Sequence, residues 1–142
     1  MRLVLDASVI VKWLVADTEH ETDVDQALVL MEKVRTGEVS LIQPVHWLTE
    51  VAAVLARLNP ETVESDLEFL HEMTLDVVDS LALQRRACRL AIDLNHHLFD
   101  TLYHAVALET DKATLVTADR RYLRKARQVG RIVALTEWET VA

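Results

Sequence analysis

Short apolar runs alternate with longer amphipathic segments along the chain, and this alternation predicts strands and helices in turn. Leu3, Val4 and Leu5 form the first unbroken apolar run, a pattern typical of a buried parallel strand. Later runs predict four more strands, at 40–43, 75–78, 113–116 and 131–134. Helical spacing of apolar side chains predicts helices at 9–15, 27–34, 45–58, 63–71, 83–94, 99–109 and from Asp119 to about 128.

This order of elements is typical of an α/β protein. Parallel strands joined by right-handed helical crossovers place helices on both faces of one sheet. Turn signals agree with the boundaries, since Asn59-Pro60 separates two helices, Ser80 suits a helix N-cap and Gly130 ends the last helix. We predict one domain over residues 1–142, because a chain of this length fits a single core.

Composition excludes several classes of protein. The single cysteine, Cys88, cannot form an internal disulfide, and no Cys/His zinc pattern occurs, which favours a reducing cytoplasm. Asp6, Ser8 and Lys12 interrupt the apolar N-terminus, which therefore predicts neither a signal peptide nor a membrane span. With two glycines and no Gly-x-Ser-x-Gly, the chain has no P-loop, dinucleotide fingerprint or nucleophile elbow. We expect a soluble cytoplasmic protein with no membrane partner.

The net charge of −8 is unevenly distributed along the chain. Residues 1–80 carry 5 Lys and Arg against 16 Asp and Glu, whereas residues 81–142 carry 10 against 7. Two basic groups are candidates for contacting RNA phosphates: Arg85, Arg86 and Arg89, and then Arg120, Arg121, Arg124 and Lys125. Either group alone is equally typical of a solvated helix face.

Four carboxylates are expected near one edge of the sheet: Asp6, Glu50, Asp100 and Asp119. Open α/β sheets bind ligands at the carboxyl ends of their strands. Gathered carboxylates repel one another, so they take up protons or a divalent cation. Oxygen ligands without His or Cys favour Mg²⁺ or Mn²⁺. A local interpretation competes, because the three aspartates stand near helix starts and could be N-caps, and Glu50 could face the surface.

Other side chains suggest different chemistry. His96, Asp100 and His104 follow one another at intervals of one helical turn, which makes a His/Asp transition-metal site conceivable. The tryptophans at 13, 47 and 138 could stack on nucleic-acid bases, although core anchors are the more common role. A phosphoacceptor signalling domain shares the fold class, but the chain lacks a convincing phosphate-contacting lysine after a late strand.

Four segments of the chain resemble the PIN domain family, and the compact size is most similar to the VapC-type toxins of type II toxin–antitoxin pairs. The segments are Val4–Val9, Glu50–Leu55, Phe99–Ala107 and Thr117–Tyr122. The resemblance implies a three-layer α/β/α sandwich with a five-stranded parallel sheet. It also implies that Mg²⁺ or Mn²⁺ and the catalytic reaction depend on Asp6, Glu50, Asp100 and Asp119, supported by Ser8 and Thr117.

The same resemblance implies a ribonuclease toxin. Its expected properties are cleavage of single-stranded RNA to leave 3′-hydroxyl and 5′-phosphate ends, frequent homodimers, and a cognate antitoxin that blocks the site. Two positions depart from the family pattern, since Thr101 stands where alanine is common and His96-His97 replaces an ordinary turn. Neither removes an acid, so both bear on substrate preference. The alternative function is a catalytically silent PIN-fold module that binds RNA or a partner.

Overall fold

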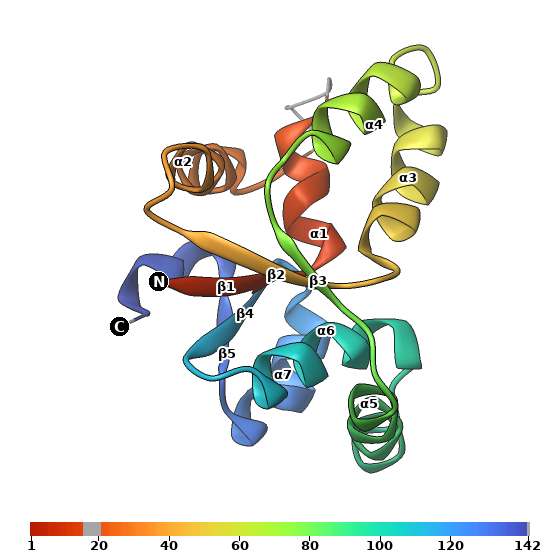
Figure 1. The fold of residues 1–142 in the computed structure, drawn as a ribbon, viewed down its shortest axis with the longest axis vertical. Coiled ribbons are helices and arrows are strands. Elements are labelled where there is room, and N and C mark those ends of the chain that lie inside the picture. The colour runs from red at the N-terminus through yellow and green to blue at the C-terminus, as the bar shows by residue number, and fades with distance from the viewer. Residues whose placement is uncertain (16–20, 142) are drawn as a thin grey trace.

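The computed structural model describes residues 1–15 and 21–141 and contains a parallel sheet between layers of helices (Figure 1). The strands are β1 (Arg2–Leu5), β2 (Ser40–Pro44), β3 (Asp76–Val78), β4 (Ala113–Thr117) and β5 (Ile132–Ala134). They form a five-stranded sheet in the order β3-β2-β1-β4-β5, and every neighbouring pair is parallel. This confirms the α/β class and the five-stranded parallel sheet predicted from the sequence.

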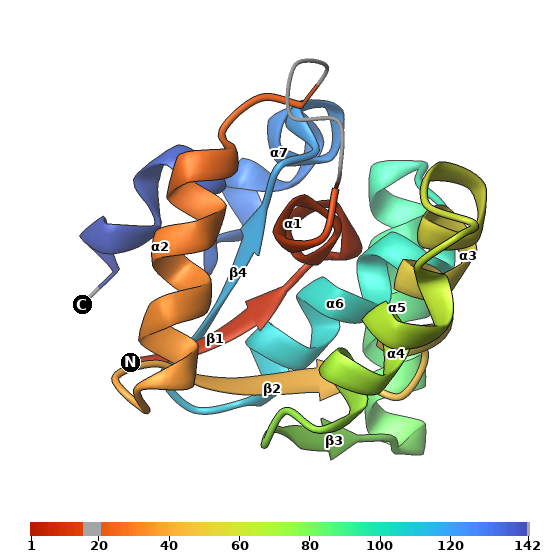
Figure 2. The same cartoon turned by 90° about the horizontal axis from the view of Figure 1, so that it is seen from above.

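Helices cover both faces of the sheet. They are α1 (Ala7–Ile10), α2 (Val24–Arg35), α3 (Trp47–Leu58), α4 (Val63–His71), α5 (Leu81–Leu94), α6 (Leu98–Glu109) and α7 (Arg120–Ala126). Figure 1 shows α1 to α4 above the sheet and α5 to α7 below it, and in Figure 2 α1 lies between α2 and the α3–α4 pair. Within the described ranges, no helix is both long enough and apolar enough to cross a membrane.

Predicted and observed boundaries differ mainly where helices tighten into 3-10 turns. The helix expected at 9–15 begins earlier, as α1, and continues as η1 (Val11–Trp13). The basic helix changes at Ala126 to η2 (Arg127–Val129), and η3 (Leu135–Thr140) has no counterpart in the prediction. Ser80 caps α5 as expected, because its hydroxyl accepts a 3.1 Å hydrogen bond from the Leu83 amide.

The core surrounds β1, which lies at the centre of the sheet. Residues 3–5 are fully buried, and α6, in which residues 105–107 are also fully buried, packs against β1. The same core contains Trp13, Trp47 and Trp138, all buried. Their predicted alternative role in stacking on bases is therefore wrong, and they are core anchors.

The carboxyl end of β1 is held on both sides by different means. β1 pairs with β4 along its length, but with β2 only through its first two residues. Beyond them, the side-chain amide of Gln43 replaces the ladder: it accepts a 2.7 Å hydrogen bond from the Leu5 amide and donates one of 2.9 Å to the Leu5 carbonyl. β1 and β2 therefore separate toward the carboxyl end of β1, and Gln43 supplies hydrogen bonds to the main-chain amide and carbonyl of Leu5 there.

Candidate active site

The strand order reverses between β1 and β4, because β2 and β3 lie on one side of this pair and β5 on the other. Open α/β sheets form a ligand crevice at such a point, outside the carboxyl ends of the strands. An open pocket of about 580 Å³ lies there. Its lining includes all four acids expected from the sequence, Asp6, Glu50, Asp100 and Asp119.

Asp6 directly follows β1 and is held by hydroxyl groups. Its Oδ2 accepts hydrogen bonds from Ser8 Oγ and, at 3.3 Å, from Thr117 Oγ1. Each hydroxyl also binds the segment after β4: Ser8 Oγ accepts from the Ala118 amide at 3.1 Å, and Thr117 Oγ1 accepts from the Asp119 amide at 3.0 Å. The two hydroxyls expected to support the acids thus connect the ends of β1 and β4.

Burial and neighbouring negative charge make Asp6 unusual. Desolvation raises the pKa of Asp6 to about 6, against the opposing hydrogen bond from Ser8, and the other three acids of the pocket add to the rise. Although Asp6 occupies the N-cap position of α1, its side chain makes no hydrogen bond to the amides of that described helix. The interpretation of Asp6 as a helix cap is therefore wrong.

The other two aspartates differ in their local bonds. Asp119 Oδ1 accepts a 3.1 Å hydrogen bond from the Tyr122 amide, so Asp119 caps α7 as well as lining the pocket. Asp100 lies in the first turn of α6, whose N-cap is His97, so the prediction that it caps the helix is wrong. Instead, Asp100 Oδ2 lies 2.6 Å from His96 Nε2 and 3.1 Å from His97 Nε2.

Glu50 leaves one carboxylate oxygen unsatisfied. It lies in the first turn of α3, and its side chain is 29% exposed, so it is not an ordinary surface residue. Its Oε2 is 3.0 Å from His46 Nε2, but that nitrogen hydrogen-bonds to the Phe99 carbonyl at 2.9 Å. Glu50 Oε2 is thus buried with no hydrogen bond from the described residues. Because such an oxygen is costly without a partner, the site fits a cation.

The histidines near Asp100 are not the ones predicted for a transition-metal site. His104 is fully buried, and its nitrogens bind the Tyr122 hydroxyl at 2.9 Å and the Gly130 carbonyl at 2.8 Å, so it cannot join His96 and Asp100. His97 takes the place predicted for His104, because the ligand atoms of His96, His97 and Asp100 all lie within 4.8 Å of one another. In the described part of the chain, no three of the four acids come as close together.

The basic side chains of α7 lie beside the acidic pocket. Arg121 and Lys125 line a second depression, and His97 and Asp119 belong to the linings of both cavities. Arg120 and Arg124 are exposed on the same helix. Positive charge is therefore available next to the acids, as an anionic substrate requires.

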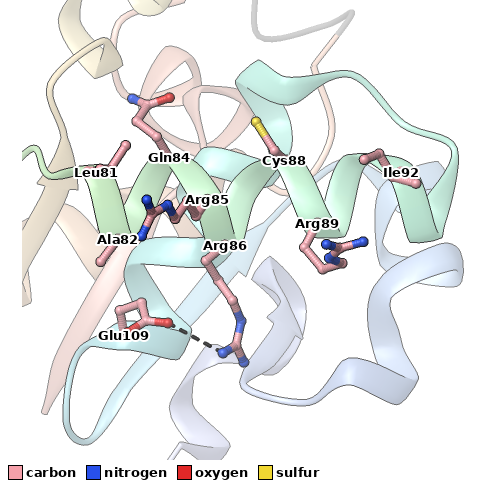
Figure 3. A pocket seen from close by; sticks show the side chains of 9 residues that line it. All are labelled: Leu81, Ala82, Gln84, Arg85, Arg86, Cys88, Arg89, Ile92 and Glu109. Atoms are coloured by element: carbon pink, nitrogen blue, oxygen red, sulfur yellow. Dashed lines mark hydrogen bonds and ion pairs between the residues drawn. The ribbon is translucent and has the colours of Figure 1, made fainter.

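The basic side chains of α5 lie on a separate surface. Arg85, Arg86 and Arg89 are exposed and line a groove along α5 (Figure 3). In this groove Arg86 pairs with Glu109 at 3.3 Å. Among the described residues, the groove and the acidic pocket have no lining residue in common.

Comparison with known proteins agrees with this geometry. Residues 3–128 match the family model described as the PIN domain. The chain belongs to the PIN domain family. This confirms the resemblance drawn from the four sequence segments. No curated protein matches the PIN-domain chain.

A solved structure shares the fold of this PIN domain. It is the crystal structure of VapBC2 from Rickettsia felis bound to a DNA fragment from their promoter. The TM-score is 0.64 at 18% sequence identity, and the alignment covers 94% of this chain and 97% of that chain. At this identity the likeness establishes a common fold.

Basic side chains inside the acidic pocket of this PIN domain were not anticipated from the sequence. Lys12 is buried and donates hydrogen bonds to the Glu21 carboxylate at 2.8 Å and the Thr22 carbonyl at 2.6 Å. Arg57 also lines the pocket. A signal for Lys12 was present, because it lies one helical turn after Ser8 within an otherwise apolar run.

Proposed function

We propose that this PIN domain is a Mg²⁺- or Mn²⁺-dependent endoribonuclease that hydrolyses RNA phosphodiester bonds. The acidic pocket is the observation that carries the proposal, since four carboxylates from distant parts of the sequence line one cavity. The raised pKa of Asp6 and the unsatisfied Oε2 of Glu50 indicate that this pocket needs positive charge. Because the donors are carboxylate oxygens, a hard cation is the appropriate ligand, held by Asp6, Glu50, Asp100 and Asp119.

A divalent cation bound there supplies positive charge that polarises the scissile phosphate and lowers the pKa of a water. The carboxylate of Asp6 or Asp100 accepts the proton of the attacking water. The water oxygen forms a bond to phosphorus as the bond from phosphorus to the 3′ oxygen breaks, and the 3′ oxygen takes a proton from solvent, which leaves a 3′-hydroxyl and a 5′-phosphate. Ser8 and Thr117 fix the orientation of Asp6 during this step.

Basic side chains beside the acidic pocket attract the RNA substrate. Arg121 and Lys125 line the adjoining depression, where the backbone of a bound RNA strand would place its phosphates. Arg120 and Arg124 extend the positive surface along α7. We assign Arg85, Arg86 and Arg89 only a long-range contribution, because they line the separate groove on α5.

We further propose that the chain is a VapC-type toxin of a type II toxin–antitoxin pair, acting in the cytoplasm as one domain over residues 1–142. Its partners would be RNA, a second copy in a homodimer, and a cognate antitoxin that covers the acidic pocket. The support is the four sequence segments, the compact size, and the fold shared with VapBC2 from Rickettsia felis.

Cleavage of labelled single-stranded RNA by the purified chain tests the ribonuclease proposal. Mn²⁺ should support cleavage, EDTA should abolish it, and Asp6→Asn and Asp100→Asn should each slow it roughly 100-fold or more. Asp93→Asn, which changes an exposed acid on α5, should cut at the parent's rate. Parent-like cleavage by Asp6→Asn would contradict the proposal. A parent chain that neither cuts RNA nor binds Mn²⁺ in calorimetry would be the silent module.

A further inference from the structure

His96 lies in the loop between α5 and α6 and is fixed on several sides. Its amide donates a 3.0 Å hydrogen bond to the Ala91 carbonyl near the end of α5. Its imidazole contacts the ring of His97, with centroids 4.6 Å apart, and the ring of Tyr122, with centroids 4.8 Å apart. The side chain is only 7% exposed. The ring is therefore held in place before any ligand binds.

Both ring nitrogens of His96 have a partner. Lys125 Nζ lies 3.3 Å from Nδ1, and because an ammonium group donates but cannot accept, Nδ1 is the acceptor. Lys125 is itself held by a 2.9 Å hydrogen bond to the Asn95 carbonyl. A neutral imidazole that accepts at Nδ1 carries its proton on Nε2. That nitrogen lies 2.6 Å from Asp100 Oδ2, so the proton points to one defined carboxylate oxygen.

We propose that His96 is a positioning residue for the divalent cation: it occupies Oδ2 of Asp100 and leaves Oδ1 as the ligand atom. A hydrogen bond from outside the ligand set fixes the orientation of a ligating carboxylate, and loss of such a bond typically weakens metal affinity roughly 10–100-fold. Lys125 acts one step further out, by selecting the tautomer of His96. This inference rests on the proposed function, because it requires the cation to bind at Asp100.

A zinc site is the competing interpretation of the same side chains. His96, His97 and Asp100 have the composition of a three-ligand zinc site. However, zinc at Nε2 of His96 would require that nitrogen to lose its proton, and the proton would then lie on Nδ1, facing the Lys125 ammonium. A metal bound through His96 would therefore break the hydrogen bond from Lys125, and we favour the positioning role.

Two substitutions by amide side chains distinguish the effect of the hydrogen bond to Asp100 from the effect of having any polar side chain at position 96. The amide nitrogen of glutamine is as many bonds from Cβ as Nε2 of histidine, so His96→Gln keeps a donor for Asp100. The amide of asparagine reaches only the position of Nδ1, so His96→Asn loses that donor. A third variant, His96→Phe, keeps the ring that contacts Tyr122 and removes both nitrogens, and it replaces His96→Asn should the latter not fold.

Calorimetric titration of the folded proteins with Mn²⁺ is the test. His96→Asn and His96→Phe should bind roughly 10–100-fold more weakly than the parent, and His96→Gln within about threefold of it. The matched control, His71→Ala at the exposed end of α4, should bind like the parent. In RNA cleavage at limiting Mn²⁺, His96→Asn should have a lower kcat than the parent and an unchanged KM for RNA. Excess Mn²⁺ should restore the kcat of this variant.

The outcomes separate this inference from the proposed function. Parent-like Mn²⁺ affinity in His96→Asn and His96→Phe would overturn the positioning role alone, provided that Asp100→Asn still loses binding. A parent that does not bind Mn²⁺, or an Asp100→Asn variant that binds it equally well, would overturn the proposed function. Zn²⁺ binding that both His96→Gln and His97→Ala abolish would establish the zinc site and also overturn the positioning role.

Discussion

The metal-free protein should become more stable when Asp6 is replaced by asparagine, although the replacement removes a proposed metal ligand. The pKa of Asp6 rises from 3.8 to about 6 on folding, which corresponds to a cost of about 3 kcal/mol for keeping this carboxylate charged in the folded state. Because the folded pKa is the higher one, the stabilising effect of the protonated form is complete below pH 3.8 and is lost as the pH rises through about 6. Asparagine carries no charge at any pH and escapes this loss.

Urea unfolding in EDTA measures the effect. The stability advantage of Asp6→Asn over the parent should grow from about 1 kcal/mol near pH 4.5 to about 3 kcal/mol at pH 7.5. In thermal unfolding at pH 7.5, this corresponds to an increase in Tm of roughly 10 °C. The control variant Asp93→Asn, at an exposed position, should follow the parent across the same pH range.

Addition of Mn²⁺ should remove this difference in stability. An ion at 100 times its Kd stabilises the parent by about 2.7 kcal/mol, whereas a variant that has lost the site gains little. The advantage of Asp6→Asn should then shrink to near zero. The reasoning is refuted if the parent and Asp6→Asn are equally stable in EDTA at pH 7.5, because Asp6 would then carry no penalty from burial and repulsion.

Three further predictions concern helix capping, the sheet and the substrate surface. Ser80→Ala should lower the free energy of unfolding by about 1 kcal/mol in urea titrations, because the first turn of α5 loses its acceptor, and an unchanged value would contradict this. Gln43→Met keeps the side-chain volume but leaves the amide and carbonyl of Leu5 without their hydrogen-bond partners. It should therefore lower the free energy of unfolding by about 2–4 kcal/mol in the same assay. A decrease below about 1 kcal/mol would contradict the stabilising role of the two hydrogen bonds from Gln43. Arg121→Ala should weaken RNA binding roughly fivefold in fluorescence anisotropy and reduce the salt dependence of binding. Arg85→Ala should change the affinity for RNA less than about twofold. Equal losses of affinity would show that α5 also contacts RNA.

The strands could be predicted because parallel strands buried on both faces appear as unbroken apolar runs. Residues 3–5 show this pattern fully and residues 113–116 show it apart from Thr114, and both segments lie at the centre of the sheet. The edge strand β3 was located one residue too early, since its side chains are largely exposed and give a weaker signal. Strand order could not be derived from local patterns, because it depends on which distant segments pack together.

The acids of the site could be selected from the sequence, but their local roles could not. An aspartate before a helix has the same sequence signature whether it caps that helix, as Asp119 does, or binds hydroxyl groups, as Asp6 does. Spacing failed for the histidines in a similar way. His96 and His104 are each four residues from Asp100, yet α6 begins at residue 98, so only His104 lies within the helix, where it turns to Tyr122. Such distinctions depend on where a helix starts and what packs against it.

The pairing of β1 with β4 has a consequence for the order of events during synthesis. Thr117, which binds Asp6, follows it by 111 residues, so the pocket joins two segments that are synthesised far apart in time. Until residues 113–117 have been translated, Asp6 has neither β4 nor the hydroxyl of Thr117 beside it. Under the proposed function, the nuclease becomes active only after β4 has been synthesised and has paired with β1, so a polypeptide that stops before β4 does not cleave RNA.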